Sequence, residues 1–326
     1  MDDPSVRPLT DDLVLPFQIE ASRLRGRMVK LGPALDEILA RHKYPEPVAR
    51  FLAETMALAV LLSSMLKYDG IFTLQTKGDG PIKLMVADIT SVGDIRAYAQ
   101  YDEDELKKAA DDVAIAPAPA LLGKGYIAFT VDQGPNTDRY QGIVELYGKT
   151  LADCVQHYFR QSEQIDTGLT ISVDQETLSD GGDGAWRAGG IMVQRLPQEE
   201  TEKVLGSGDE DAWRRAMVLL STTTGEELLA SDLAASDLLF RLFHEDGVRV
   251  WQPKGLRFGC RCSRERVSDM LSSLPRDEVQ ELKIDDGRVE VVCQFCSTAY
   301  HFDDADLDRV YGNPGGGNPG DGKPQA

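Results

Sequence analysis

The sequence predicts an α+β protein: an N-terminal domain of antiparallel sheets around a buried helix, a helical middle linker and a small C-terminal domain. Three observations lead to this prediction. Strand-like runs separated by turn residues fill the N-terminal part, one long helix there is apolar on nearly all sides, and four of the five cysteines come late. We place the boundaries at 1–197, 198–255 and 256–311, with a tail at 312–326.

The composition limits the class of protein. A length of 326 residues suggests about two domains of ~100–200 residues each, and 42% hydrophobic residues are enough for a sizeable core. The net charge of −19 argues against a general nucleic-acid binder and against docking to anionic lipid. The acidic, polar N-terminus does not look like a signal peptide, and no apolar run reaches the ~18–20 residues of a membrane span. We therefore expect a soluble cytoplasmic protein.

The N-terminal domain is predicted from one helix and seven strands. Residues 45–67 have helical apolar spacing and are apolar nearly all round from Met56 onward, as in a helix covered on several sides. The turns Gly78-Asp79-Gly80-Pro81 and Gly134-Pro135-Asn136 indicate hairpins. The predicted strands are 71–76, 82–89, 94–101, 126–131, 142–147, 169–173 and 190–196.

A second helix is predicted over 151–161, where Leu151, Cys154 and Val155 begin an apolar stripe. Cys154 lies on that stripe, which favours a buried core thiol over a reactive one.

The linker is acidic. Residues 198–247 contain twelve Asp or Glu and four Lys or Arg, a net charge of −8, and include predicted helices at 211–220 and 236–243, the second capped by Ser236. Two interpretations stay open: a small helical domain with a solvated acidic face, or a weakly stable segment whose apolar groups must dock onto a neighbour. The Gly/Pro-rich tail at 312–326 is predicted to be disordered.

Four late cysteines form two close pairs, Cys260/Cys262 and Cys293/Cys296. Two such pairs match a tetrahedral Zn²⁺ site in which each supplies two ligands, and a reducing cytoplasm disfavours permanent disulfides. The second pair lies between two strand-like runs, unlike a thioredoxin-type pair, which opens a helix. The C-x-C pair needs a turn, which Gly259 permits. We expect one Zn²⁺ per chain in the reduced form.

Other polar residues near the cysteines are given lesser roles. His301 is close in sequence, but four sulfurs already complete the shell, so we place it outside the ligand set. Four arginines are predicted to offset the negative charge of the site and activate the thiolates: Arg257, Arg261, Arg264 and Arg266. A basic nucleic-acid patch is disfavoured because residues 256–311 hold twelve acidic and eight basic groups.

These motifs resemble the redox-regulated thirty-three-kilodalton heat-shock chaperones of bacteria. The resemblance rests on 260–267 (CRCSRERV), 293–296 (CQFC) and 300–302 (YHF), and it covers roughly residues 10–311. Further blocks agree: YQGIVEL at 140–146, YFRQSEQ at 158–164, AGGIMVQRLP at 188–197 and RLFHEDGVRV at 241–250. Asp166 stands where that family usually has proline.

The resemblance implies an ATP-independent holding chaperone, not an enzyme, that binds unfolding client proteins. In the family the reduced cysteines bind zinc and the chaperone is off. Oxidation expels the zinc and forms disulfides within each pair, here Cys260–Cys262 and Cys293–Cys296; the zinc domain unfolds, and the active form is a dimer. Apolar faces of the linker would then hold clients, such as Trp213/Met217/Leu220 and Leu238/Leu239/Leu242.

Two other classes remain as alternatives. A thiol-disulfide oxidoreductase would use Cys293 and Cys296, but it would not need the second pair. A zinc-ribbon nucleic-acid adaptor conflicts with the charge of −19. The sequence contains no Walker, dinucleotide-binding, H-E-x-x-H or G-x-S-x-G motif.

Overall fold

A computed structural model describes residues 11–22, 24–110, 121–134, 137, 140–177, 183–195 and 208–312. The chain divides into two compact units, residues 1–259 and 260–326. Each unit is described by itself below. The predicted tail, apart from Gly312, lies outside the described residues.

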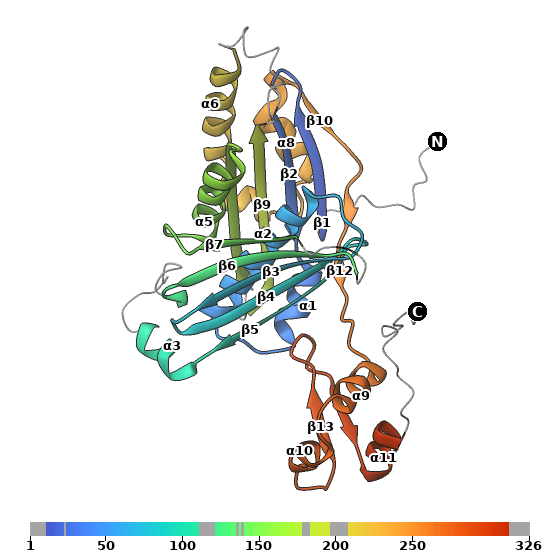
Figure 1. Ribbon diagram of the computed structural model, residues 1–326. Helices are drawn as coiled ribbons and strands as arrows, with labels where there is room; N and C mark the ends of the chain where they lie inside the picture. The colour runs from blue at the N-terminus through green and yellow to red at the C-terminus, as the bar shows by residue number, and fades with distance from the viewer. Residues whose placement is uncertain are drawn as a thin grey trace, which may run out of the picture. The chain divides into compact units, whose positions relative to one another are not determined.

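The first unit contains two sheets whose strands run across one another (Figure 1). Sheet A has the order β10-β1-β2-β9-β8, with β11 beside β1, and is antiparallel throughout. Its strands are β1 (Leu13–Ile19), β2 (Leu24–Leu31), β8 (Thr167–Thr177), β9 (Asp183–Arg195), β10 (Val248–Val250) and β11 (Lys254–Gly255).

Sheet B has the order β12-β5-β4-β3-β6-β7 and is antiparallel except for the short pairing of β12 with β5. Its strands are β3 (Ile71–Gly78), β4 (Ile82–Thr90), β5 (Asp94–Tyr101), β6 (Gly125–Asp132), β7 (Tyr140–Glu145) and β12 (Arg257–Phe258). All seven predicted strands are therefore present in the two sheets. The hairpin turn at 78–81 is confirmed by the pairing of β3 with β4, whereas Pro135 and Asn136 of the second turn lie outside the described residues.

Helix α2 (Glu46–Ser64) is the predicted buried helix, and it packs against strands of both sheets. By length and composition it is the one described helix that could cross a membrane, but 78% of its apolar window is buried inside the protein. It is therefore a core helix. The other described helices of this unit are α1 (Pro33–Ala40), α3 (Glu103–Ala110), α5 (Leu151–Tyr158), α6 (Gly208–Ser221), α7 (Gly225–Leu229), α8 (Ala235–Phe243) and the short turns η1 (Phe159–Glu163) and η2 (His244–Asp246).

Strands β1 and β2 were not predicted, although β1 lies inside sheet A between β2 and β10. Strand β1 alternates between two apolar environments: Val14 joins the core around α2, while Leu15 and Phe17 join a second core on the other face. Because both faces are covered, the run is apolar without the polar alternation of a half-exposed strand. Pro16 also weakens a strand prediction.

The linker helices α6, α7 and α8 lie on the outer face of sheet A and share its second core. Leu220, Leu238 and Leu239 are buried there, and Phe243 stacks on Phe17 with ring centroids 5.9 Å apart. The described part of the acidic segment is therefore not a separate compact unit; its apolar faces are docked. Trp213, Met217 and Leu242 are partly buried against the same core.

Polar contacts add to this docking. Lys30 of β2 is 1% exposed, and its ammonium group donates to the carbonyl oxygens of Ala230 and Leu233, which lie between α7 and α8. Three linker carboxylates are paired with arginines: Glu210 with Arg195, Glu227 with Arg241 and Asp246 with Arg215. Arg195 and Lys30 come from sheet A and so offset part of the linker's net charge of −8. Arg215 and Arg241 belong to the linker and are already counted in that charge.

Three local expectations have definite outcomes. Ser236 does not cap α8: that helix begins at Ala235 after Ala234, so Ser236 is its second residue and contacts the Asp237 side chain instead. Cys154 is confirmed as a buried core thiol, 3% exposed. Asp166 leaves the local turn intact, because its carbonyl oxygen accepts from the Arg195 backbone and its carboxylate pairs with the same residue.

Glu54 of α2 provides a pH-dependent contribution to stability. Burial raises the pKa of its carboxyl group to about 7. A hydrogen bond from the Leu151 backbone lowers this pKa, but burial has the larger effect. Because the pKa is higher in the folded chain than the ordinary value of 4.5, stability is lost as the pH rises from about 4.5 to about 7. Glu54→Gln should stabilise the first unit at pH 8 by up to about 3 kcal/mol and change little at pH 5.

The measurement is the urea midpoint of the first unit at the two pH values. Glu46→Gln, in the first turn of the same helix with an exposed side chain, is the matched control. An equal effect of Glu54→Gln at both pH values would contradict the assignment.

The second unit is small. It contains α9 (Arg264–Ser272), α10 (Arg276–Glu281), the hairpin of β13 (Val289–Val292) and β14 (Ala299–Phe302), and α11 (Asp304–Gly312). Its core consists of six buried apolar residues: Val267, Leu271, Val279, Val289, Phe302 and Leu307. The Tyr311 hydroxyl donates to the carbonyl oxygens of Leu271 and Leu274 and so holds α11 near the end of α9.

Candidate metal centre

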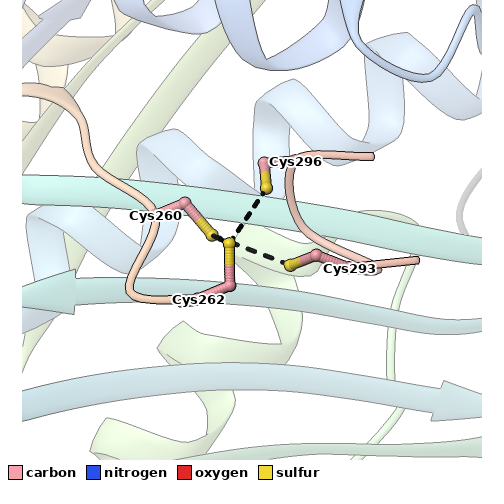
Figure 2. A group of neighbouring side chains, drawn as sticks. All are labelled: Cys260, Cys262, Cys293 and Cys296. Carbon is pink, nitrogen blue, oxygen red and sulfur yellow. Dashed lines mark hydrogen bonds between the residues drawn. The ribbon is translucent and has the colours of Figure 1, made fainter. Parts of the chain in front are cut away.

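The four cysteines of the second unit converge on one point (Figure 2). Their sulfur atoms all lie within 4.8 Å of one another. The Sγ–Sγ distances are 3.4 Å for Cys260–Cys262, 3.7 Å for Cys260–Cys293 and 3.3 Å for Cys262–Cys296. All five cysteines of the chain are free thiols in this structure, and Cys154 belongs to the other unit.

The C-x-x-C pair lies in the turn of the β13–β14 hairpin, as its flanking sequence predicts. The Cys293 backbone N–H donates to the Thr298 carbonyl oxygen, and Ser297 donates back to the Cys293 carbonyl oxygen. Ser297 adopts a left-handed φ of 56°, which turns the chain between the strands. The hairpin thereby directs both sulfurs to one side.

The C-x-C pair directly precedes α9, which is capped by the Ser263 side chain. Gly259 was expected to permit the turn before this pair, but its φ does not lie in the left-handed region. A Cβ atom at this position would lie 2.6 Å from the Cβ of Asp94, so a larger residue would require a local shift. That Gly259 permits the turn stays a prediction.

Two polar side chains next to the sulfurs were missed by the sequence analysis. The Tyr300 hydroxyl donates to Cys262 Sγ over 3.1 Å, and Thr298 Oγ1 lies 3.2 Å from Cys296 Sγ.

The thiols differ in how readily they ionise. Burial, reinforced by the neighbouring thiols, raises the pKa of Cys262 to about 12 and also raises that of Cys293. Burial acts the same way on Cys296, but hydrogen bonds with Thr298 and the other thiols lower its pKa to about 7. Holding all four sulfurs as adjacent thiolates therefore requires a cation that neutralises their charge.

The donor set fits a tetrahedral metal ion. With metal–sulfur bonds of about 2.3 Å, the sulfurs of a tetrathiolate site are about 3.8 Å apart. The observed distances of 3.3 to 3.7 Å are close to this edge length. The four cysteines thus form a cluster consistent with a metal site.

His301 is not among these ligands. Its side chain faces Glu290, the residue opposite it on β13, with Nδ1 3.6 Å from the carboxylate. This agrees with the sequence-based view that four sulfurs complete the set.

The predicted arginines serve mainly structural contacts. Arg257 pairs with Asp94 in the first unit. Arg264 pairs with Asp306, donates to the His301 carbonyl oxygen and lies 4.4 Å above the Phe302 ring. Arg266 donates to the Arg261 carbonyl oxygen. These contacts hold the segment that carries Cys260 and Cys262 against β14 and α11.

Comparison with known proteins identifies the family. The family model described as "Hsp33 protein" matches residues 12–303. The chain belongs to the Hsp33 family. A 33 kDa chaperonin from Caulobacter vibrioides is 42% identical over 294 residues, 90% of this chain and 95% of that protein. A 33 kDa chaperonin from Pseudomonas fluorescens is 37% identical over 313 residues, 95% of this chain and 97% of that protein.

The fold is also that of the family. The crystal structure of the 33 kDa chaperonin of Thermotoga maritima superposes with a TM-score of 0.71 and 22% identity, over 92% of this chain and 98% of that one. This Hsp33-family member is a chaperone and not an enzyme. The oxidoreductase alternative also fails on structure, because Cys293 and Cys296 lie in a hairpin turn and not at a helix start.

Proposed function

We propose that this chain is an ATP-independent holdase that oxidation switches on. The reduced chain would bind one Zn²⁺ through Cys260, Cys262, Cys293 and Cys296 and be inactive. Oxidation would convert the thiols to two disulfides and expose apolar surface that binds unfolding client proteins. The observation that carries the proposal is the convergence of four thiols, within 4.8 Å, beside an apolar core of six buried residues in the described part of the second unit.

The chemistry uses peroxide or hypochlorous acid as the oxidant. One thiolate of a pair attacks the peroxide oxygen to give a sulfenic acid, and the second thiolate displaces its oxygen as water to close the disulfide. Each disulfide consumes one peroxide, so a chain with two disulfides consumes two. Bound zinc would supply ligand-derived folding energy and hold the sulfurs as thiolates. Disulfides within close pairs enclose very short loops, so they stabilise the fold much less than the bound zinc would.

The disulfide pairing proposed here is Cys260–Cys262 and Cys293–Cys296. Peptide mapping of the peroxide-treated chain should give these two within-pair bonds. The competing bond is Cys262–Cys296, whose sulfurs are 3.3 Å apart in the reduced arrangement. Its detection as the main product would contradict the pairing.

We further propose that the active form is a homodimer and that the protein works in the cytoplasm, without nucleic acid or membrane partners. The relatives named 33 kDa chaperonin support client binding. The net charge of −19 supports the absence of nucleic-acid and anionic-lipid partners.

The test is aggregation of a chemically unfolded client, followed by light scattering with reduced or peroxide-treated chain. We expect suppression only after peroxide, together with release of about one zinc per chain, as four thiolate ligands require. Cys154→Ser should behave as the unaltered chain. Equal suppression by both forms would refute the switch, and catalytic turnover of disulfides would favour the oxidoreductase alternative.

A further inference from the structure

A cavity of about 350 Å³ lies in the first unit, on the side away from the linker helices. It is lined by residues of β1, β2, the end of α2 and the segment around β11. Its volume is within the range of small-molecule sites. Three basic side chains reach it from three different elements: Arg27 from β2, Lys67 from the segment after α2 and Lys254 from β11.

No carboxylate lines this cavity, although the chain has 54 acidic and only 35 basic residues. Arg27 donates to the carbonyl oxygens of Ser64 and Gly26, over 3.1 and 2.8 Å, and Lys254 donates to that of Ser91 over 2.8 Å. Within the described part of the chain, none of the three cations forms an ion pair. Among the described residues, these three cations therefore have no carboxylate partner in hydrogen-bonding contact, and Asp94 acts on Lys254 only through its charge.

Two carboxylates near the lining residues make contacts outside the cavity. Asp69 accepts a hydrogen bond from Ser91 Oγ, and Asp94 pairs with Arg257 over 2.7 Å. Burial lowers the pKa of both Arg27 and Lys254, which means that each cation lies where its charged form is disfavoured. An anion in the cavity would offset this cost.

The rest of the lining is mostly apolar. Val14, Val60 and Ile89 contribute alkyl surface, and Tyr68 adds an aromatic ring whose hydroxyl donates to the Ile89 carbonyl oxygen. A ligand suited to this cavity therefore has a compact negative group and an apolar body. Inorganic phosphate satisfies only the first condition.

We infer that this cavity binds a small phosphomonoester, with its phosphate held by Arg27, Lys67 and Lys254 and its apolar body against Val14, Val60 and Ile89. This inference is independent of the redox proposal. It has a consequence for stability, because Lys254 lies on β11, which pairs with β1 and leads to β12. A ligand that bridges Lys254 to Arg27 would hold this segment on the first unit and raise its unfolding temperature.

The test is calorimetric titration of the reduced, zinc-loaded full chain with phenyl phosphate, inorganic phosphate and benzyl alcohol. We expect phenyl phosphate to bind one per chain, about tenfold or more tighter than inorganic phosphate, and benzyl alcohol not to bind. Lys67→Gln and Lys254→Gln should each weaken phenyl phosphate about tenfold. Lys77→Gln, on an exposed position of β3 away from the cavity, is the control.

Lys67 is exposed, so its substitution leaves folding intact and keeps the test decisive. Several outcomes would overturn the inference. These are absence of phenyl phosphate binding, binding unchanged by both lysine substitutions, benzyl alcohol binding equally well, or inorganic phosphate binding as tightly as phenyl phosphate.

Discussion

Cys260→Ser is expected to unfold residues 260–312 under reducing conditions while the first unit stays folded. Residues 260–312 have a core of six buried apolar residues, and burial alone stabilises a domain of this size only marginally. A structural zinc contributes of order 10 kcal/mol to the folding of such a unit. Losing one thiolate of four removes much of that contribution, and the remaining core cannot replace it.

The first unit should not follow, because it has its own two cores. Zinc content, far-UV circular dichroism and hydrogen exchange together measure the outcome. Exchange protection should disappear from α9, β13 and β14 and persist in α2 and β3. Removing zinc from the unaltered chain with a strong chelator should give the same pattern.

Cys154→Ser is the matched control. It changes the same atom at a buried cysteine of the first unit, where the thiol donates to the Tyr147 carbonyl oxygen, a contact that a serine hydroxyl can keep. It should retain zinc and protection in both units. Tight zinc binding by Cys260→Ser would contradict the assignment of that cysteine as a ligand.

The parts of the fold and of the site that could be predicted from the sequence are those that depend on local sequence patterns. From Met56 onward the helix Glu46–Ser64 is apolar nearly all round, and this sequence pattern predicts a helix covered on several sides. In the structure it packs against strands of both sheets. The cysteine cluster followed from spacing, since two close pairs about thirty residues apart have one common metal-binding arrangement. The strand-like flanks of Cys293 and Cys296 correctly indicated a hairpin.

The features that the sequence did not predict depend on contacts between distant residues. Strand β2 contains three basic residues, so its sequence does not resemble a buried strand. Only the structure shows that Lys30 is buried, with its ammonium group donating hydrogen bonds to carbonyl oxygens about two hundred residues away in the sequence. The linker helices could form a domain or dock; the choice depended on β1, whose outer face they cover. The cavity at Lys254 likewise lies between β1, β2, α2, β4 and β11, which no local sequence pattern connects.

Phe243→Ala is expected to make the reduced, zinc-loaded chain hold clients without oxidant. Phe243 is fully buried at the end of α8 and stacks on Phe17 of β1. Removing such a ring costs about 3–5 kcal/mol, and the loss falls on the docking of the linker helices to sheet A. A change of about 3 kcal/mol raises the undocked population more than a hundredfold.

The undocked state exposes apolar surface on both partners, including Leu238 and Leu239 on the helix and Phe17 on the sheet. The four-cysteine cluster lies in the other unit, so the zinc content should be unchanged. Light scattering of an unfolding client with reduced protein measures the holding activity, and hydrogen exchange in α6 to α8 measures undocking.

Phe240→Ala is the control on the same helix, since Phe240 is 61% exposed and its loss should leave docking intact. If Phe243→Ala loses exchange protection in the linker but still fails to hold clients, the docked apolar face is not the client surface. If Phe243→Ala holds clients with zinc still bound, then undocking of the linker helices is sufficient for client binding. Oxidation would then act only by causing this undocking, because the linker itself contains no cysteine. The marginal element of the switch is then the docking of the linker helices on sheet A. There Arg195 pairs with Glu210 of α6, and the buried Lys30 donates to carbonyl oxygens between α7 and α8.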